Sequence, residues 1–185
     1  MKEGQGLQTA QMDGLVRVFF SADLPVSASV AISAWVNKNL LTQFSRARWV
    51  PPENYHITLH FVGQVAGAAI DDLANTLQRL ESTESITARC GGLIWLPDTQ
   101  RPKVLALAVE SSGALERLAE CLNNPRPLRA HITLARRVAS TDRGKLTQTA
   151  IPSFEFSLPS LSLRQSLSTA DGVGYPSLSI LPLGG

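Results

Sequence analysis

Apolar runs that alternate with polar residues at a spacing of two dominate this chain, and they predict mainly β-strands. In three other segments the apolar residues recur every three or four positions, which predicts helices over 27–41, 68–80 and 112–122. The predicted strands cover 16–22, 55–62, 86–96, 104–109, 130–137, 153–157, 159–168 and 175–182.

Serine and glycine residues mark several limits of these segments. Ser27 is expected to cap the first helix, and Ser111 or Ser112 is expected to cap the third. The pair Gly91-Gly92 predicts a bend within the strand that contains it.

The order strand, helix, strand occurs twice, over 16–62 and again over 104–138. This repetition suggests an internal duplication with pseudo-two-fold symmetry. We therefore expect one domain over 14–185, made of two lobes, with a flexible tail over 1–13. The length of 185 residues is sufficient for such a domain to bury a sizeable core.

The tetrapeptide His-Ile-Thr-Leu occurs at 56–59 and again at 131–134, within the predicted strands over 55–62 and 130–137. Residues i and i+2 of a strand point to the same side, about 6–7 Å apart. Each copy therefore presents an imidazole and a hydroxyl on one face and two aliphatic side chains on the other. Two imidazoles on matched strands could serve as one general base and one general acid near neutral pH.

The net charge of +2 does not indicate a general nucleic-acid-binding protein, but the distribution of charge is uneven. No acidic residue occurs between Asp23 and Glu53 or between Glu120 and Asp142, and each window leads into or contains a motif. If both motifs face one cleft, the cleft should attract an anion; chance clustering on a solvated face is the alternative. The basic residues of the two windows are Lys38, Arg46, Arg48, Arg126, Arg129, Arg136 and Arg137.

The two cysteines, Cys90 and Cys121, are too far apart in sequence for a short-spaced metal pair and too few for a disulfide framework. We expect both to be small buried residues of a protein kept in a reducing compartment. No apolar run reaches the length of a membrane span, and the first residues lack the apolar centre of a signal peptide. A cytoplasmic monomer is therefore expected.

The residues around the two motifs resemble the signatures of the 2H phosphoesterase superfamily. The segment RWVPPENYHITLHFVG over 48–63 resembles the first signature, and HITLAR over 131–136 resembles the second. The segments RVFFSADLP over 17–25 and YPSLSILPL over 175–183 also resemble the RNA 2′,3′-cyclic phosphodiesterase branch, known as bacterial and archaeal 2′-5′ RNA ligases. The resemblance extends over nearly the whole chain after residue 14.

This resemblance implies a bilobal α+β fold made of two pseudo-symmetric lobes of antiparallel sheet, with helices on the outside and an active-site cleft between the lobes. It implies hydrolysis of RNA 2′,3′-cyclic phosphate ends to 2′-phosphomonoesters with no metal and no cofactor. By this analogy His131 is the base and His56 the acid, while Thr58 and Thr133 donate to the non-bridging phosphate oxygens. The reverse reaction would join RNA ends through a 2′-5′ linkage.

Four further residues are candidates for the substrate cleft. The resemblance implies a phosphate contact for Arg136, although strict alternation places it opposite His131 unless a bulge turns it inward. Phe19 is expected either to stack on a base or to be an ordinary core residue. His60 is expected on the face of His56, about 13 Å away, which is too far for a shared metal. Tyr175 is the fourth candidate.

The sequence departs from the family at Ala106, where relatives often have tryptophan, and at Ala130, where a proline is usual. Two alternatives remain open. One is a phosphodiesterase acting on another small cyclic phosphate, such as ADP-ribose 1″,2″-cyclic phosphate. The other is a module of the same fold that binds nucleotides or RNA ends without turnover. The intact His and Thr of both motifs favour an enzyme, because a binding module has no need of two proton-transfer groups.

Overall fold

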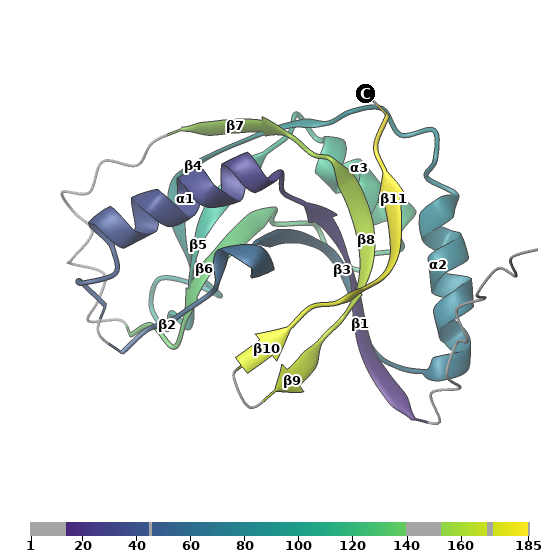
Figure 1. The fold of residues 1–185 in the computed structure, drawn as a ribbon, viewed down its shortest axis with the longest axis horizontal. Helices are drawn as coiled ribbons and strands as arrows, with labels where there is room; N and C mark the ends of the chain where they lie inside the picture. Colours follow the sequence, from purple (N-terminus) through teal and green to yellow (C-terminus); the bar gives the residue numbers. More distant parts are fainter. Residues whose placement is uncertain (1–13, 45, 140–152, 170–171, 185) are drawn as a thin grey trace, which may run out of the picture.

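The computed structural model describes residues 14–44, 46–139, 153–169 and 172–184. Within these residues the chain forms an α+β fold with a curled, nine-stranded antiparallel sheet (Figure 1). The tail predicted over 1–13 lies outside the described residues, and that prediction stays untested. Among the described residues no helix is both long and apolar enough to cross a bilayer.

The helices lie between strands in the part of the chain before His131, and the described elements that follow are all strands. The helices are α1 (Val26–Asn39), α2 (Ile70–Gln78) and α3 (Ala114–Cys121), with short 3-10 turns η1 (Pro52–Asn54) and η2 (Gly67–Ala69). The strands of the large sheet are β1 (Leu15–Asp23), β2 (Arg48–Trp49), β3 (His56–Ala66), β4 (Thr87–Leu96), β5 (Val104–Glu110), β6 (His131–Arg136), β7 (Phe154–Ser157), β8 (Ser160–Gln165) and β11 (Ser177–Pro182). A separate hairpin consists of β9 (Leu167–Thr169) and β10 (Gly172–Gly174).

Every predicted strand and helix is present, with ends that differ by a few residues, and two expectations about helix starts need correction. Ser27 lies inside α1, which begins after Pro25 without a side-chain cap. Gly113 occupies the cap position of α3 with a φ of 80°, a conformation that glycine adopts readily. The Ser111 hydroxyl still accepts a hydrogen bond from the N–H of Leu115 at 3.0 Å, so its predicted role is partly correct.

The strand order is β11-β8-β1-β3-β6-β5-β4-β7, with β2 paired to β6. Strand β1 pairs with β3, strand β5 pairs with β6, and the two halves join where Ile57 of β3 lies opposite Ile132 of β6. We call this β3–β6 contact the seam. The two strand–helix–strand units are therefore arranged symmetrically about the seam, as the repeat predicted. The two lobes are halves of one continuous curled sheet.

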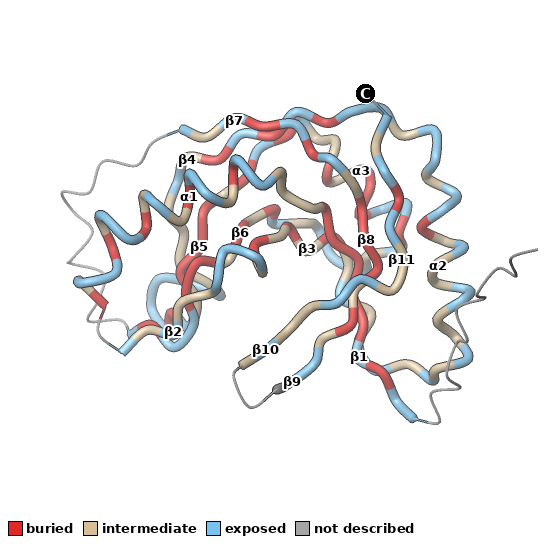
Figure 2. The backbone as a smooth tube through the Cα atoms, in the orientation of Figure 1, coloured by how far each residue is buried: buried red, intermediate tan, exposed pale blue. Residues whose placement is uncertain are grey.

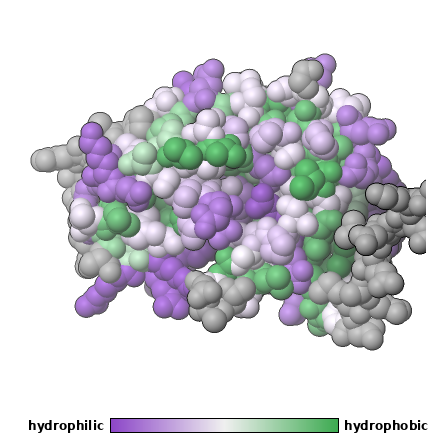
Figure 3. Space-filling view, viewed as in Figure 1, coloured by the Kyte–Doolittle hydropathy of each residue, from purple (hydrophilic) through white to green (hydrophobic). Residues whose placement is uncertain are grey.

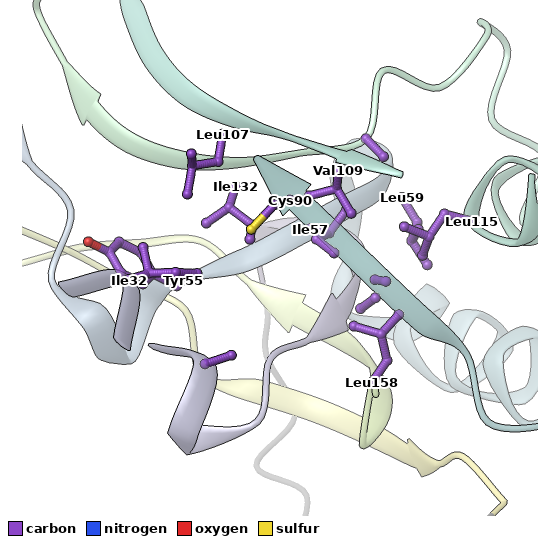
Figure 4. Close-up of a cluster of buried hydrophobic side chains, with 14 of the residues drawn as sticks. Ile32, Tyr55, Ile57, Leu59, Cys90, Leu107, Val109, Leu115, Ile132 and Leu158 are labelled. Carbon is purple, nitrogen blue, oxygen red and sulfur yellow. The ribbon is translucent and has the colours of Figure 1, made fainter. Parts of the chain in front are cut away.

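The core lies between the sheet and its helices. The buried segments concentrate in the central strands, and Ile57 and Ile132 are 0% exposed (Figure 2). Leu107, Val109 and Leu115 surround them (Figure 4). Burying an aliphatic side chain of this size contributes about 1.5–3 kcal/mol, so the seam is held mainly by its apolar side.

The cysteines differ in environment. Cys90 is buried in the core, as predicted, and burial raises its pKa to about 11. Cys121 is exposed, so the expectation of two buried cysteines is wrong for this residue. It lies at the end of α3 on a helix face that the apolar stripe of that helix does not cover.

Hydrophilic and hydrophobic residues are interspersed over the face shown in Figure 3.

Candidate active site

The seam brings the two motifs together on one face of the sheet. Ile57 and Ile132 lie directly opposite each other and point into the core. The residues before and after them therefore point to the other face, because side chains alternate along a strand. Since the strands are antiparallel, His56 lies next to Thr133 across the seam, and Thr58 lies next to His131. The structure thus assembles all four residues named by the motif: His56, Thr58, His131 and Thr133.

Both imidazoles are anchored in the same way. The Nδ1 of His56 lies 2.8 Å from the carbonyl oxygen of Asn54, and the Nδ1 of His131 lies 2.6 Å from that of Arg129. A carbonyl only accepts hydrogen bonds, so each Nδ1 carries the hydrogen and donates it. In the neutral ring the other nitrogen, Nε2, is then an acceptor. Each copy of the motif thus leaves Nε2 as the nitrogen available to a substrate.

Both motifs end in a β-bulge at their leucine. On β3 the extra residue is Leu59, because the residues before and after it pair with consecutive residues of β1. On β6 the extra residue is Leu134, by the same criterion against β5. A bulge shifts the alternation of the residues that follow it. The faces predicted for residues beyond the two leucines are therefore reversed.

The bulge at Leu134 brings Arg136 to the site. Arg136 pairs with Val104, and Ala106, two residues further along β5, pairs with Thr133. Paired residues of neighbouring strands point to the same face. Arg136 therefore lies on the face of Thr133 and is exposed there. The sequence predicted that Arg136 could contact a phosphate only if a bulge turned it toward the face of His131, and the bulge at Leu134 does so.

The bulge at Leu59 has the opposite effect on His60. Its Nδ1 lies 2.6 Å from the carbonyl oxygen of Leu122 at the end of α3, and its ring lies 6.2 Å from the core residue Phe20. His60 therefore faces the helices, and the prediction that it shares the strand face of His56 is wrong. Strict alternation through Leu59 would place His60 on the face of His56, but the bulge reverses the faces of the residues that follow it. Phe61 occupies the site face instead and is 49% exposed.

Phe19 and Tyr175 pack around the ring of His56. The ring centroids of Phe19 and Tyr175 each lie 5.1 Å from that of His56, and Tyr175 meets Phe19 edge-on at 5.4 Å. Phe19 is only 2% exposed, so its ring has no free face for a base and the stacking expectation does not hold. Both residues instead fix the orientation of His56.

Tyr175 also lines a small pocket of about 60 Å³. Arg48 of β2 lies directly opposite Arg136 of β6 in this pocket. One arginine thus comes from each of the two acid-free windows. Two like charges placed directly opposite each other are destabilising unless an anion lies between or near them. The pocket is completed by Trp49, Val50, Pro51, Asn54 and Val173.

Comparison with known proteins identifies the family of this fold and site. The sequence profile of LigT-like phosphoesterases matches residues 25–106, which include the first motif. An RNA 2′,3′-cyclic phosphodiesterase of Thermus thermophilus is 31% identical over 147 residues, covering 69% of this chain and 72% of the relative. The chain belongs to the LigT-like phosphoesterase family. The enzyme of the same name from Bacillus subtilis is 28% identical over 141 residues, covering 69% of this chain and 75% of the relative.

Solved structures of LigT-like phosphoesterases share the architecture. Escherichia coli LigT complexed with ATP superimposes with a TM-score of 0.75 at 25% identity, covering 93% of this chain and 99% of LigT. A Thermus thermophilus protein superimposes with a TM-score of 0.71 at 26% identity, covering 91% of this chain and 98% of that protein. The bilobal LigT-like fold expected from the sequence is therefore confirmed.

A buried ion pair next to His56 was not predicted. Asp23 is the cross-strand partner of His56, and its carboxylate accepts a hydrogen bond from Arg164 of β8 at 2.8 Å. Both side chains are 13% exposed. The hydroxyls of Ser160, at 2.6 Å, and Ser162 donate to the other carboxylate oxygen. This cluster, which we call the Asp23 network, ties β1 to β8 on the site face, next to His56.

The equivalent position in the other half of the site carries no charged side chain. The cross-strand partner of His131, equivalent to Asp23, is Ala108. The two imidazoles therefore have matching backbone anchors but different charged neighbours. The only sequence signal for the Asp23 network was a set of polar residues in an otherwise apolar strand, namely Ser160, Ser162 and Arg164.

The surroundings of His56 favour its neutral form. Burial lowers the pKa of His56 from 6.5 to about 4. The hydrogen bond to the carbonyl of Asn54 opposes this change, as does the charge of Asp23, whereas the charges of Arg164 and Arg136 lower the pKa further. In the free protein His56 is therefore unprotonated at neutral pH.

His131 is also shifted toward the neutral form. Burial is again the main cause of its lowered pKa, and the positive charges of Arg129 and Arg136 act in the same direction, against the hydrogen bond to the carbonyl of Arg129. Both imidazoles are thus able to accept a proton, and the one that acts as an acid must gain its proton before the reaction.

Among the described residues, no three His, Cys, Asp or Glu side chains gather to form a possible metal site.

Proposed function

We propose that this chain hydrolyses the 2′,3′-cyclic phosphate at an RNA end to a 2′-phosphomonoester, without a metal ion. The observation that carries the proposal is the meeting of two His–Thr pairs at the seam, each with Nε2 available. A reaction at phosphorus needs one group to take a proton from water and another to give one to the departing ribose oxygen. A pair of opposed imidazoles supplies both.

In the proposed reaction the Nε2 of His131 takes a proton from water as the water oxygen forms a bond to phosphorus. The bond from phosphorus to the 3′ oxygen breaks, and Nε2 of His56 protonates that oxygen, leaving the phosphate on the 2′ oxygen. The hydroxyls of Thr58 and Thr133 donate to the non-bridging oxygens, where negative charge increases. Arg136 supplies positive charge on the same face. The assignment of acid and base follows the family resemblance.

Relatives support RNA as the substrate class. The Thermus thermophilus and Bacillus subtilis relatives are both named RNA 2′,3′-cyclic phosphodiesterase, and Escherichia coli LigT has been crystallised with ATP. The arginines that reach the site from both halves of this chain suit an anionic ligand of the same kind.

The deciding experiment is to identify the product. The protein is incubated in EDTA with an oligoribonucleotide that ends in a 2′,3′-cyclic phosphate, and the product isomer is determined by phosphorus NMR or by phosphatase sensitivity. We expect a 2′-phosphate to accumulate in the presence of the chelator. A 3′-phosphate product, or turnover that EDTA abolishes, would contradict the proposal. A second oligonucleotide with a free 5′-hydroxyl tests whether the reverse reaction forms a 2′-5′ linkage.

The lowered pKa values of both histidines predict an acidic optimum for kcat/KM. One imidazole must be protonated, and because both pKa values lie below the ordinary 6.5, the protonated fraction falls with rising pH before neutrality is reached. Since kcat/KM reports the free enzyme, its maximum is expected below pH 6.5. The bound phosphate raises the pKa of a nearby imidazole, so the maximum of kcat should lie at higher pH.

Steady-state kinetics between pH 4 and 9, together with proton NMR titration of the histidine rings, check this pH prediction. A kcat/KM maximum at or above pH 7.5 would contradict it. The titration of His56 is expected near pH 4.

A further inference from the structure

Phe61 presents an aromatic ring to solvent on the site face. It is 49% exposed, whereas the phenylalanines at 19, 20 and 44 are at most 2% exposed. The guanidinium carbon of Arg17 lies 4.8 Å from the centroid of the Phe61 ring. We call these two residues the Arg17–Phe61 platform. The family profile begins at residue 25 but contains Phe61, so only half of the platform lies in the matched segment.

The platform continues a row of rings that starts at the catalytic histidine. The ring of Phe19 lies 5.1 Å from that of His56 and 6.3 Å from that of Phe61, to which it is nearly parallel at 16°. Because Phe19 is buried, it supports Phe61 from the inside and leaves only the outer ring accessible. The row therefore leads along β1 and β3 from the reacting centre to an exposed stacking surface.

Planar surfaces of this composition suit nucleobases. Bases of single-stranded RNA stack on aromatic rings and on arginine guanidinium groups. Among the described residues no carboxylate forms an ion pair with Arg17, so its charge can also attract a backbone phosphate. A mononucleoside cyclic phosphate has a single base and no second backbone phosphate, so it cannot occupy the reacting centre and the platform together.

We propose that the Arg17–Phe61 platform binds the nucleotide that precedes the cyclic phosphate in the RNA chain, by stacking of its base. The inference rests on the proposed function and specifies its substrate as an RNA end of at least two nucleotides. The reacting nucleotide lies at His56 and the buried Phe19, and the next nucleotide reaches the exposed ring beyond them. The platform thereby selects oligonucleotides over mononucleotides.

The test compares kcat/KM for adenosine 2′,3′-cyclic phosphate with that for the diadenosine dinucleotide ending in the same group. The wild-type protein is expected to prefer the dinucleotide by about tenfold, within the range of one base–aromatic stack. Phe61→Ala is expected to bring this ratio close to one, mainly through KM. Phe61→Tyr keeps the ring and should keep the ratio, and Val30→Ala on the exposed side of α1 is the matched surface control.

A dinucleotide whose first residue is abasic separates stacking from the phosphate contact. With the wild-type protein it should behave as the intact dinucleotide does with Phe61→Ala. Equal use of mono- and dinucleotide by the wild-type protein would overturn the inference and leave the proposed function intact. An equal loss on both substrates in Phe61→Ala would also overturn it, because the ring would then hold the terminal base. No turnover of either substrate by the wild-type protein would overturn the proposed function itself.

Discussion

Replacing His56 or His131 with alanine is expected to lower kcat by about 10²–10⁴-fold, the usual contribution of one positioned acid or base. In the proposed mechanism each variant loses the imidazole that moves the proton on its side of the phosphate. The double variant is expected to lose little more than either single one, because groups that act as a unit are not additive. Single-turnover rates on a cyclic-phosphate oligonucleotide measure these effects.

The third histidine provides a matched control. His60 lies on the same strand as His56 but faces α3, where its ring contacts the Leu122 carbonyl. His60→Gln keeps a hydrogen-bond donor for that carbonyl and is expected to leave kcat within about twofold, as surface or non-site changes do. Near-normal kcat in either motif variant would rule out the two-histidine mechanism. A large loss of kcat in His60→Gln would show that His60 takes part in the reaction.

Replacing Asp23 with alanine is expected to destabilise the fold by about 3–5 kcal/mol, because it leaves the buried Arg164 charge without its partner. The hydroxyls of Ser160 and Ser162 lose their acceptor at the same time. Urea unfolding followed by tryptophan fluorescence measures the change in the free energy of unfolding.

The exposed pair Arg89–Glu110 is the control for this change. Its N–O distance is 2.9 Å, similar to that of the buried pair, but its side chains are 60% and 74% exposed. Glu110→Ala is expected to cost less than about 1 kcal/mol, since exposed ion pairs contribute little. Equal effects of Asp23→Ala and Glu110→Ala would show that burial of the Asp23 network does not matter. Arg164→Met combined with Asp23→Ala should recover part of the loss, since it removes the unpaired charge.

The catalytic pairs were accessible to sequence reasoning because they depend on local geometry. Alternation along a strand puts a His and a Thr two residues apart on one face, and this holds for His56 with Thr58 and for His131 with Thr133. The repeat also predicted that the two units are related by symmetry. The pairing of Ile57 with Ile132 that realises this symmetry is a long-range contact, which alternation alone does not specify.

The same alternation failed beyond the motif leucines. A bulge adds one unpaired residue, and nothing in the repeated Leu59 or Leu134 distinguishes a bulged residue from a paired one. His60 and Phe61 therefore exchanged faces relative to the prediction, while Arg136 turned toward the site. The Asp23 network joins residues that are 141 positions apart, so a single sequence offers no direct signal for it.

The near-equivalence of the two half-sites has a consequence for how acid and base come to differ. A perfect two-fold arrangement would give both imidazoles the same proton affinity, yet the reaction needs one donor and one acceptor. Both half-sites have the same backbone anchors and the same bulges, so these features cannot make the proton affinities of the two imidazoles differ. Two of the differences lie at equivalent positions: Asp23 stands where Ala108 stands in the other half, and Phe61 stands where Arg136 does. Under the proposed mechanism, exchanging these side chains between the two halves is expected to shift the relative proton affinity of the two imidazoles, and with it the direction of proton transfer.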